Sequence, residues 1–335
     1  MRFLTSYFAT IPYRDVLITG SQRMQERPIG ILVEALRTMG AEISYQKNEG
    51  FAPILIKGKD IKSDFIVLEA NVSSQYITSL MLIAPKLKNG LKIRLRGNIT
   101  SMPYLKMTAT LLKRLGVNCL FGKNTIEIAP KRSIDSVSLT VESDWSSASY
   151  FYSVLSMSPL GSSVFMTSFR EYSLQGDSII KDLYSDLGVD TTFQNGGILI
   201  EKNRHPSNKA RHYNFVETPD IAQTFVVSCF GLGVACQIEG LHTLKIKETD
   251  RLLALENELK KLGADISVTD HSLTLNPASF QKDKLVFIDT YKDHRMAMAF
   301  SPLGIIRPIG INDPSVVSKS YPDFWEDLKT LNFEF

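Results

Sequence analysis

The sequence predicts an α/β protein built from a repeated unit of strand, helix, strand, helix, strand and strand. One short phrase, an apolar helix end followed by Gly and then a strand, recurs at Gly40, Gly116, Gly188 and Gly263. The copies lie 76, 72 and 75 residues apart, which indicates a structural repeat. A second helix that is apolar nearly all round lies between successive copies, so each unit has one buried and one amphipathic helix.

The recurring glycines suit the ends of the amphipathic helices. Glycine adopts the left-handed conformation without a steric penalty and so lets a helix end and swing into a strand. The C-terminal segment FWEDLKTLNFEF carries Asn332 in the same place, 69 residues after Gly263. Asn is the next-best residue for that conformation, and we therefore count five unit ends.

The first unit begins part-way through. Residues 1–11 read as the middle of a helix with no N-cap residue ahead of them. Two domains of three units each would need six units, so either one is missing at the N-terminus or five are complete; the pattern favours neither. We expect an incomplete N-terminal domain at 1–141 and a C-terminal domain at 142–335, because a predicted strand at 136–141 ends there and a buried helix follows.

Composition narrows the class of protein. The chain is 44% hydrophobic and 22% charged, as in soluble globular proteins. A net charge of +3 with scattered basic residues argues against nucleic-acid binding, and no apolar run is long enough for a membrane span. Cys119, Cys229 and Cys236 lie in apolar runs without a CxxC pair, which predicts reduced core thiols in a cytoplasmic protein. The five histidines show no metal-ligand spacing.

The most polar stretch, KIKETDR, lies just before an amphipathic helix. It places Lys247, Glu248 and Arg251 near the helix N-terminus, where free N–H groups and the helix dipole attract anions. Two cations and a carboxylate there could hold a phosphate and move a proton. The alternative is a solvated helix start capped by Thr249 or Asp250.

Hydroxyl and amide side chains mark two further helix starts. Ser73, Ser74 and Gln75 precede an apolar helix, and Ser101 and Tyr104 repeat the design at the next one. Such groups could form a neutral phosphate cradle. Serine is also a common N-cap, so an ordinary cap is the alternative.

Charged residues occur at the remaining helix starts. Asp220 precedes one buried helix, Asp293-His294-Arg295 precede another, and Arg27 and Lys319 lie ahead of two more. Taken singly, Asp220 could be a cap and the two cations could be surface residues. Together they predict an electropositive cleft between the two domains for a small, multiply charged anion.

Five segments together resemble the 5-enolpyruvylshikimate-3-phosphate (EPSP) synthase family: KIKETDRLLALENELKKLGAD, DHRMAMAF, VSSQYITSLMLIAPKL, RMQERPIGILVEALRTMGA and SKSYPDFWEDL. They follow the family's order from Met1 to about Leu328. The resemblance implies a two-domain inside-out α/β barrel of βαβαββ repeats, with one repeat missing at the N-terminus. It implies transfer of the enolpyruvyl group of phosphoenolpyruvate to the 5-hydroxyl of shikimate 3-phosphate, on the route to aromatic amino acids. A cytoplasmic monomer without metal or cofactor is expected.

The resemblance also implies roles for individual residues. Asp220 is expected to deprotonate the 5-hydroxyl, Glu248 to protonate the enol methylene, and His294 to lie near Glu248. The residues expected to bind shikimate 3-phosphate are Ser73, Ser74, Gln75, Ser101, Tyr104 and Lys247. Those expected to bind phosphoenolpyruvate are Arg2, Arg27, Arg251, Arg295 and Lys319.

The chain departs from the family pattern in places. A family segment of the type GDKSxSxR and the Gly-rich loop ahead of Arg2 are not among these residues, and Thr243 stands where many members carry Asn. The 335-residue chain is therefore expected to be truncated and inactive or impaired. The alternatives are a non-catalytic anion-binding remnant of the same fold, a sister enzyme with a UDP-sugar acceptor, and an RNA-end-processing relative. The sister enzyme has different motifs, and the lack of a basic stripe disfavours the RNA enzyme.

Overall fold

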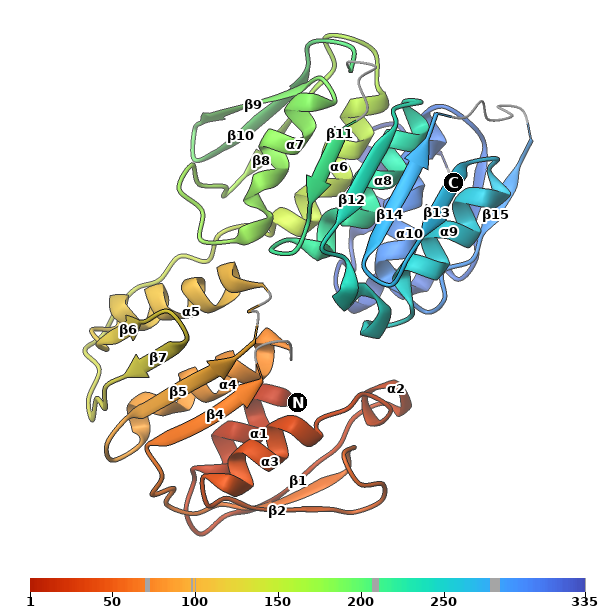
Figure 1. Ribbon diagram of the computed structural model, residues 1–335. Helices are drawn as coiled ribbons and strands as arrows, with labels where there is room; N and C mark the ends of the chain where they lie inside the picture. The colour runs from red at the N-terminus through yellow and green to blue at the C-terminus, as the bar shows by residue number, and fades with distance from the viewer. Residues whose placement is uncertain (70–72, 98, 100, 207–210, 278–283, 335) are drawn as a thin grey trace. The chain divides into compact units, whose positions relative to one another are not determined.

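The computed structural model describes residues 1–69, 73–97, 99, 101–206, 211–277 and 284–334. Contacts between Cα atoms divide the chain into two compact units, Met1–Thr140 and Val141–Phe335. Figure 1 shows the helices and strands of each unit. No helix among the described residues is long and apolar enough to cross a membrane.

Helices and strands alternate through the first unit. Its helices are α1 (Arg2–Ala9), α2 (Gln22–Gln25), α3 (Gly30–Thr38), α4 (Ser74–Ile83) and α5 (Met102–Arg114). Its strands are β1 (Asp15–Ile18), β2 (Glu42–Tyr45), β3 (Ile54–Lys57), β4 (Phe65–Glu69), β5 (Leu91–Arg96), β6 (Cys119–Phe121) and β7 (Thr125–Ile128).

The second unit continues the alternation. Its helices are α6 (Trp145–Met157), α7 (Ile180–Asp186), α8 (Ala222–Gly231), α9 (Arg251–Lys261), α10 (His294–Phe300) and α11 (Phe324–Thr330). Its strands are β8 (Ser163–Thr167), β9 (Val189–Gln194), β10 (Gly197–Lys202), β11 (Arg211–Asn214), β12 (Cys236–Glu239), β13 (Asp265–Val268), β14 (Ser272–Asn276), β15 (Val286–Ile288) and β16 (Ile309–Ile311).

Within the residues that the structure describes, the predicted six-element unit is present in full twice. In the first copy β4 pairs parallel with β5, and β7 pairs antiparallel with both β5 and β6, giving the order β4-β5-β7-β6. The second copy has the same pattern in the order β11-β12-β14-β13. The parallel pair needs a helical crossover, which α4 and α8 supply. The βαβαββ repeat is therefore confirmed.

The other sheets contain part of this pattern. The sheets β1-β3-β2 and β8-β10-β9 are antiparallel and have the arrangement of β5-β7-β6, and β15 pairs parallel with β16. The predicted strand at 136–141 is wrong: the structure describes residues 133–144 throughout, and none of them is in a helix or strand. Its alternating apolar residues suit a sheet face, but Val137, Leu139 and Val141 are exposed, so no packed face stabilises a strand.

The helix ends agree with the recurring phrase. The four glycines have positive φ angles, 104° at Gly40, 75° at Gly116, 89° at Gly188 and 90° at Gly263. Asn332 follows α11 with a φ of 65°. The prediction that Asn replaces Gly at the fifth helix end is confirmed.

Buried helices form the centre of the second unit and sheets form its outside. Helices α6, α8 and α10 contact one another and are buried along nearly their whole length. In Figure 1 the sheet that contains β12 and β14 lies in front of these helices. Because the apolar helices have no polar face for solvent, they can only be stable in the interior. This inside-out order places the N-terminal ends of α8 and α10 near one another.

The three cysteines are free and buried. Cys119 belongs to the core of the first unit, and Cys229 and Cys236 belong to the core of the second. The prediction of core thiols is confirmed.

Candidate active site

The predicted site residues fall into two groups, one in each unit. The second unit contains Asp220, Lys247, Glu248, Arg251, His294, Arg295 and Lys319. The first unit contains Arg2, Arg27, Ser73, Ser74, Gln75, Ser101 and Tyr104.

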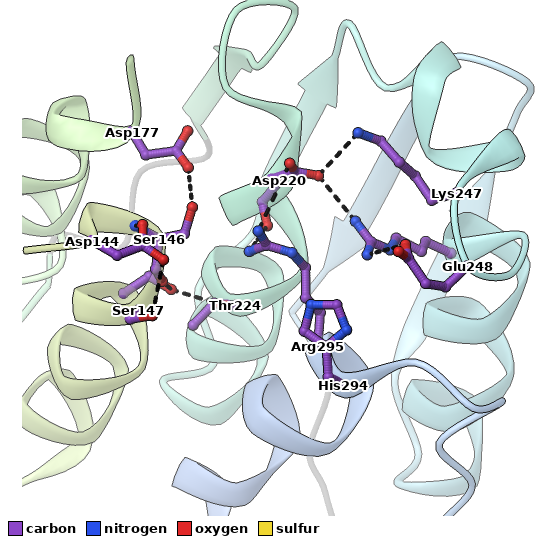
Figure 2. A network of polar contacts seen from close by, with 12 residues as sticks. Asp144, Ser146, Ser147, Asp177, Asp220, Thr224, Lys247, Glu248, His294 and Arg295 are labelled. Carbon is purple, nitrogen blue, oxygen red and sulfur yellow. Dashed lines mark hydrogen bonds and ion pairs between the residues drawn. The ribbon is translucent and has the colours of Figure 1, made fainter. Parts of the chain in front are cut away.

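Ion pairs join six of the seven residues of the second unit into one network, and His294 lies beside it next to Asp293. Figure 2 labels Asp220, Lys247, Glu248, His294 and Arg295 of this group. Short helical segments bring them together. Asp220 lies in a 3₁₀ turn that leads into α8, Lys247 follows a second 3₁₀ turn, and Arg251 begins α9. His294 and Arg295 begin α10, and Lys319 ends a 3₁₀ segment before α11.

Arg251 is at the centre of this network. Its side chain is 2% exposed, and its Nε lies 2.7 Å from Asp293 Oδ2. Its Nη1 lies 3.0 Å from Asp220 Oδ1, and its Nη2 lies 2.7 Å from Glu248 Oε2. A buried guanidinium needs such partners because desolvation of an unpaired charge is costly. Arg251 therefore sets the positions of three carboxylates.

Asp220 is held by cations on several sides. Lys247 Nζ lies 3.2 Å from Asp220 Oδ1, and Arg295 Nη2 lies 3.7 Å from Asp220 Oδ2. Arg295 Nη1 also donates a hydrogen bond of 2.9 Å to the backbone carbonyl of Asp220. Burial alone would raise the pKa of Asp220, but Arg295, Lys247 and Arg251 outweigh it and hold the pKa far below its usual range. The carboxylate is thus ionised at neutral pH.

The network carries an excess of positive charge. Four cations, at Lys247, Arg251, Arg295 and Lys319, face the three carboxylates of Asp220, Glu248 and Asp293. Lys319 is the most exposed of the cations, at 44%, and its Nζ lies 3.5 Å from Glu248 Oε1. A cluster of this composition at helix starts suits a small anion.

His294 adds a neutral imidazole. Burial and the neighbouring Arg295 lower its pKa to about 4, so the ring is uncharged at neutral pH. Its Nδ1 is buried and makes no hydrogen bond with any residue that the structure describes. It lies 3.7 Å from Asp293 Oδ1. A polar atom in this position can accept a partner when a ligand enters.

The capping alternatives are now resolved. Asp250 caps α9, since its side chain accepts a hydrogen bond of 3.1 Å from the Leu253 amide; Thr249 is not the cap. Asp293 caps α10 by accepting from the Arg295 amide at 2.8 Å. The side chain of Asp220 caps neither its 3₁₀ turn nor α8. The Asp220 carboxylate instead forms ion pairs with Lys247, Arg251 and Arg295.

In the first unit, Arg2 joins the start of α4. Its Nη1 donates to Gln75 Oε1 and, at 3.4 Å, to Ser73 Oγ. Its guanidinium lies over the Tyr76 ring, 4.9 Å from the ring centroid. Arg2, Arg27 and Gln75 line a cavity of about 120 Å³ together with Met1, Phe3, Met24, Pro28 and Ile29. Two arginines and an amide that line one cavity suit a carboxylate or another anion.

The two serine helix starts of the first unit differ in detail from ordinary caps. Ser73 and Ser101 occupy N-cap positions, but neither side chain makes a capping hydrogen bond. Their backbone position is therefore that of a cap, while their hydroxyls serve no capping function.

Comparison with known proteins decides the family. The family described as "EPSP synthase (3-phosphoshikimate 1-carboxyvinyltransferase)" matches residues 1–328. The chain belongs to the EPSP synthase family.

Relatives within the EPSP synthase family match almost the whole chain. A 3-phosphoshikimate 1-carboxyvinyltransferase of Bacteroides fragilis strain YCH46 is 44% identical, covering 99% of this chain and 81% of the relative. One from Shewanella halifaxensis is 35% identical, covering 96% of this chain and 75% of the relative. A solved EPSP synthase from Acinetobacter baumannii shares the fold with a TM-score of 0.77 at 22% identity, covering 98% of this chain and 76% of that one.

Asp177 is a buried acidic residue that was not among the predicted site residues. It is 2% exposed, its Oδ2 accepts a hydrogen bond from Ser146 near the start of α6, and its Oδ1 makes none with a described residue (Figure 2). Burial and the nearby Asp220 charge raise its pKa to about 6. The sequence carries no signal for it, because the burial of a carboxylate in this short 3₁₀ segment (Gly176–Ile179) depends on the packed fold.

Asp293 was named with His294 and Arg295 but not as the partner of Arg251. An Asp directly before a helix was a visible signal for its capping contact. Its ion pair joins residues 42 positions apart, which no local pattern reveals. Among the described residues no group of three or more His, Cys, Asp or Glu side chains could hold a metal ion.

Proposed function

We propose that this chain is a 3-phosphoshikimate 1-carboxyvinyltransferase. It transfers the enolpyruvyl group of phosphoenolpyruvate to the 5-hydroxyl of shikimate 3-phosphate and releases phosphate, in the biosynthesis of aromatic amino acids. One observation carries the proposal: in a chain that matches relatives of that name over nearly its whole length, the charged side chains of the second unit form a single network of four cations and three carboxylates. Such a network suits two polyanionic substrates.

Asp220 takes the proton of the 5-hydroxyl in the proposed reaction. A carboxylate with a very low pKa is a weak base, so the base must be strengthened when substrates bind. Lys247 and Arg295 hold the pKa of Asp220 down. Substrate anions that draw these cations toward themselves raise the proton affinity of Asp220 at the moment it is needed.

Glu248 first takes up a proton from solvent when phosphoenolpyruvate draws its cationic partners away. It gives this proton to the methylene carbon while the substrate oxygen bonds to the neighbouring carbon, which produces a tetrahedral intermediate. Its cationic partners are Arg251 and Lys319, and phosphoenolpyruvate competes for them. In the second step the carbon–oxygen bond to phosphate breaks, Glu248 takes a proton back from the methyl group, and the double bond returns. The proton held by Asp220 leaves with phosphate, so the reaction balances.

The remaining residues bind and orient the substrates. Shikimate 3-phosphate contacts Ser73, Ser74, Gln75, Ser101, Tyr104 and Lys247. Phosphoenolpyruvate contacts Arg2, Arg27, Arg251, Arg295 and Lys319, with His294 beside Glu248. The contact of Arg2 with Ser73 and Gln75 supports a shared site in the first unit.

The proposed organisation is a monomer with domains at 1–141 and 142–335, which the two compact units support. No metal or organic cofactor takes part. Three free, buried cysteines support a reducing compartment, and we place the enzyme in the cytoplasm.

The test is a calorimetric titration with shikimate 3-phosphate, with and without phosphoenolpyruvate, followed by a phosphate-release assay. We expect each substrate to tighten the binding of the other. The variant E248Q should release phosphate about 100-fold more slowly, since a general acid contributes roughly 10²–10⁴, while binding shikimate 3-phosphate as before. D220N should lose both turnover and part of that affinity.

The control is D250N, because Asn retains the α9 cap next to the site. It should match the unchanged protein in both assays. Failure of shikimate 3-phosphate to bind, with or without phosphoenolpyruvate, would refute the function. Low turnover by a polypeptide of these 335 residues alone stays a prediction, which the same assay measures.

A further inference from the structure

We propose that Glu258 is a positioning residue that holds the turn at residues 289–293 and thereby sets His294 and Arg295 in place. This inference rests on the proposed function, in which His294 and Arg295 face phosphoenolpyruvate. Glu258 lies outside the polar network described above, on the second turn of α9 beyond Arg251.

The Glu258 carboxylate is fully buried, and both of its oxygens accept hydrogen bonds. Its side chain is 0% exposed. Its Oε2 accepts a hydrogen bond of 3.0 Å from the Asp289 amide, and its Oε1 accepts one of 2.7 Å from the Tyr291 hydroxyl. Lys261 Nζ lies 2.7 Å from Glu258 Oε2 and 2.6 Å from Asp289 Oδ2. A buried carboxylate is retained only when its lone pairs are satisfied in this way.

The turn that Glu258 contacts has an unusual backbone. Tyr291 and Lys292 are consecutive non-glycine residues in the left-handed region, with φ angles of 53° and 58°. Each such residue costs about 1–2 kcal/mol, and strained backbone persists only where surrounding contacts determine it. A hydrogen bond of 2.8 Å from the Asp293 amide to the Thr290 carbonyl closes the turn. The hydrogen bonds of Glu258 with Asp289 and Tyr291 are surrounding contacts of this kind.

Helix α9 holds this turn at both ends. Arg251 and Glu258 are seven residues apart, which is about two helical turns and places them on one face. Glu258 binds the start of the turn at Asp289 and Tyr291, and Arg251 binds its end at Asp293. Asp293 in turn caps α10 at the Arg295 amide. A shift at Glu258 is therefore transmitted to the first residues of α10.

The test compares E258Q and Y291F with a matched control, E256Q. Glu256 is on the same helix but pairs only with the exposed Lys260 among the contacts of its carboxylate in the described structure. We expect E258Q to lower kcat/KM for phosphoenolpyruvate about 10- to 100-fold, as small misplacements of binding groups do. Binding of shikimate 3-phosphate should change less than twofold. Y291F removes one hydrogen bond and should show a smaller effect of the same kind, and E256Q none.

A second measurement does not depend on turnover. The titration of the His294 ring, followed by NMR and assigned with H294Q, should move upward from a pKa of about 4 in E258Q, because a loosened turn exposes the ring to water. If shikimate 3-phosphate does not bind the unchanged protein, the proposed function fails while this titration still tests the positioning role. Loss of thermal stability in E258Q and Y291F with an unchanged His294 titration would overturn the proposal. If E258Q does not fold, Y291F decides.

Discussion

Arg251 is the residue on which the second-unit network depends. Its guanidinium is almost wholly buried and has carboxylate partners on three sides, at Asp220, Glu248 and Asp293. Buried ion pairs add little net stability relative to apolar residues, but removing one partner leaves uncompensated charge in the interior. The same side chain therefore serves both the fold and the arrangement of the proposed catalytic groups.

Replacing Arg251 by Met should destabilise the chain by about 3–5 kcal/mol, because Asp293 and Glu248 lose their buried counter-ion. Urea unfolding measures the loss. The control K260M removes a lysine that is 54% exposed, whose pair with Glu256 should be worth under about 1 kcal/mol. Equal losses in the two variants would contradict the central role of Arg251.

Single residues could be predicted from the sequence to different degrees. The chemistry of Lys247, Glu248 and Arg251 was visible because helix starts and charged stretches are local patterns. The partnership of Arg251 with Asp293 and the burial of Asp177 were not visible. Both depend on which elements pack together, and a single sequence does not reveal that packing.

At the scale of elements, helix ends were predicted well and one strand was not. The left-handed residue after a helix is a local requirement, and Gly40 and Asn332 both have positive φ angles as expected. A strand needs a neighbour as well as an alternating pattern. Residues 136–141 have the pattern but form no strand.

Gly40 gives a clean test of the helix-end rule. A Cβ atom added there would meet nothing within 4 Å, so G40A should cost about 1–2 kcal/mol through the backbone alone. G40N should cost less than G40A, since Asn tolerates this conformation. At the fifth helix end N332A should be destabilising and N332G should not. Thermal unfolding of the four variants checks the order, and an equal cost for G40A and G40N would contradict it.

For the whole molecule, the buried side chains of His294 and Asp177 have opposite effects on the free energy of unfolding as pH changes. The unfolded His294 takes up a proton near pH 6.5 and the folded one only near pH 4, so stability is lost as pH falls through this window. Asp177 behaves in the opposite sense. Its folded form keeps a proton up to about pH 6 that the unfolded form releases near pH 3.8, so stability is lost as pH rises. Each contribution is about 3 kcal/mol, and they largely cancel.

Removing either group should reveal the other. Relative to the unchanged protein, the unfolding free energy of D177N should rise by about 3 kcal/mol between pH 4 and pH 6. That of H294Q should fall by a similar amount between pH 4 and pH 6.5. Urea titrations at four pH values suffice. A pH-independent difference for either variant would show that its group does not titrate as described.

The reactivity of the buried cysteines reports on local and global unfolding of the chain. Burial raises the pKa of Cys119 and of Cys229, and only a thiolate that meets solvent reacts with an alkylating reagent. Alkylation therefore occurs only after local or global unfolding exposes the thiol. Cys119 records the opening of the first unit, and Cys229 and Cys236 record that of the second. One time course of alkylation, read by mass spectrometry, thus measures the stability of each unit without an added probe.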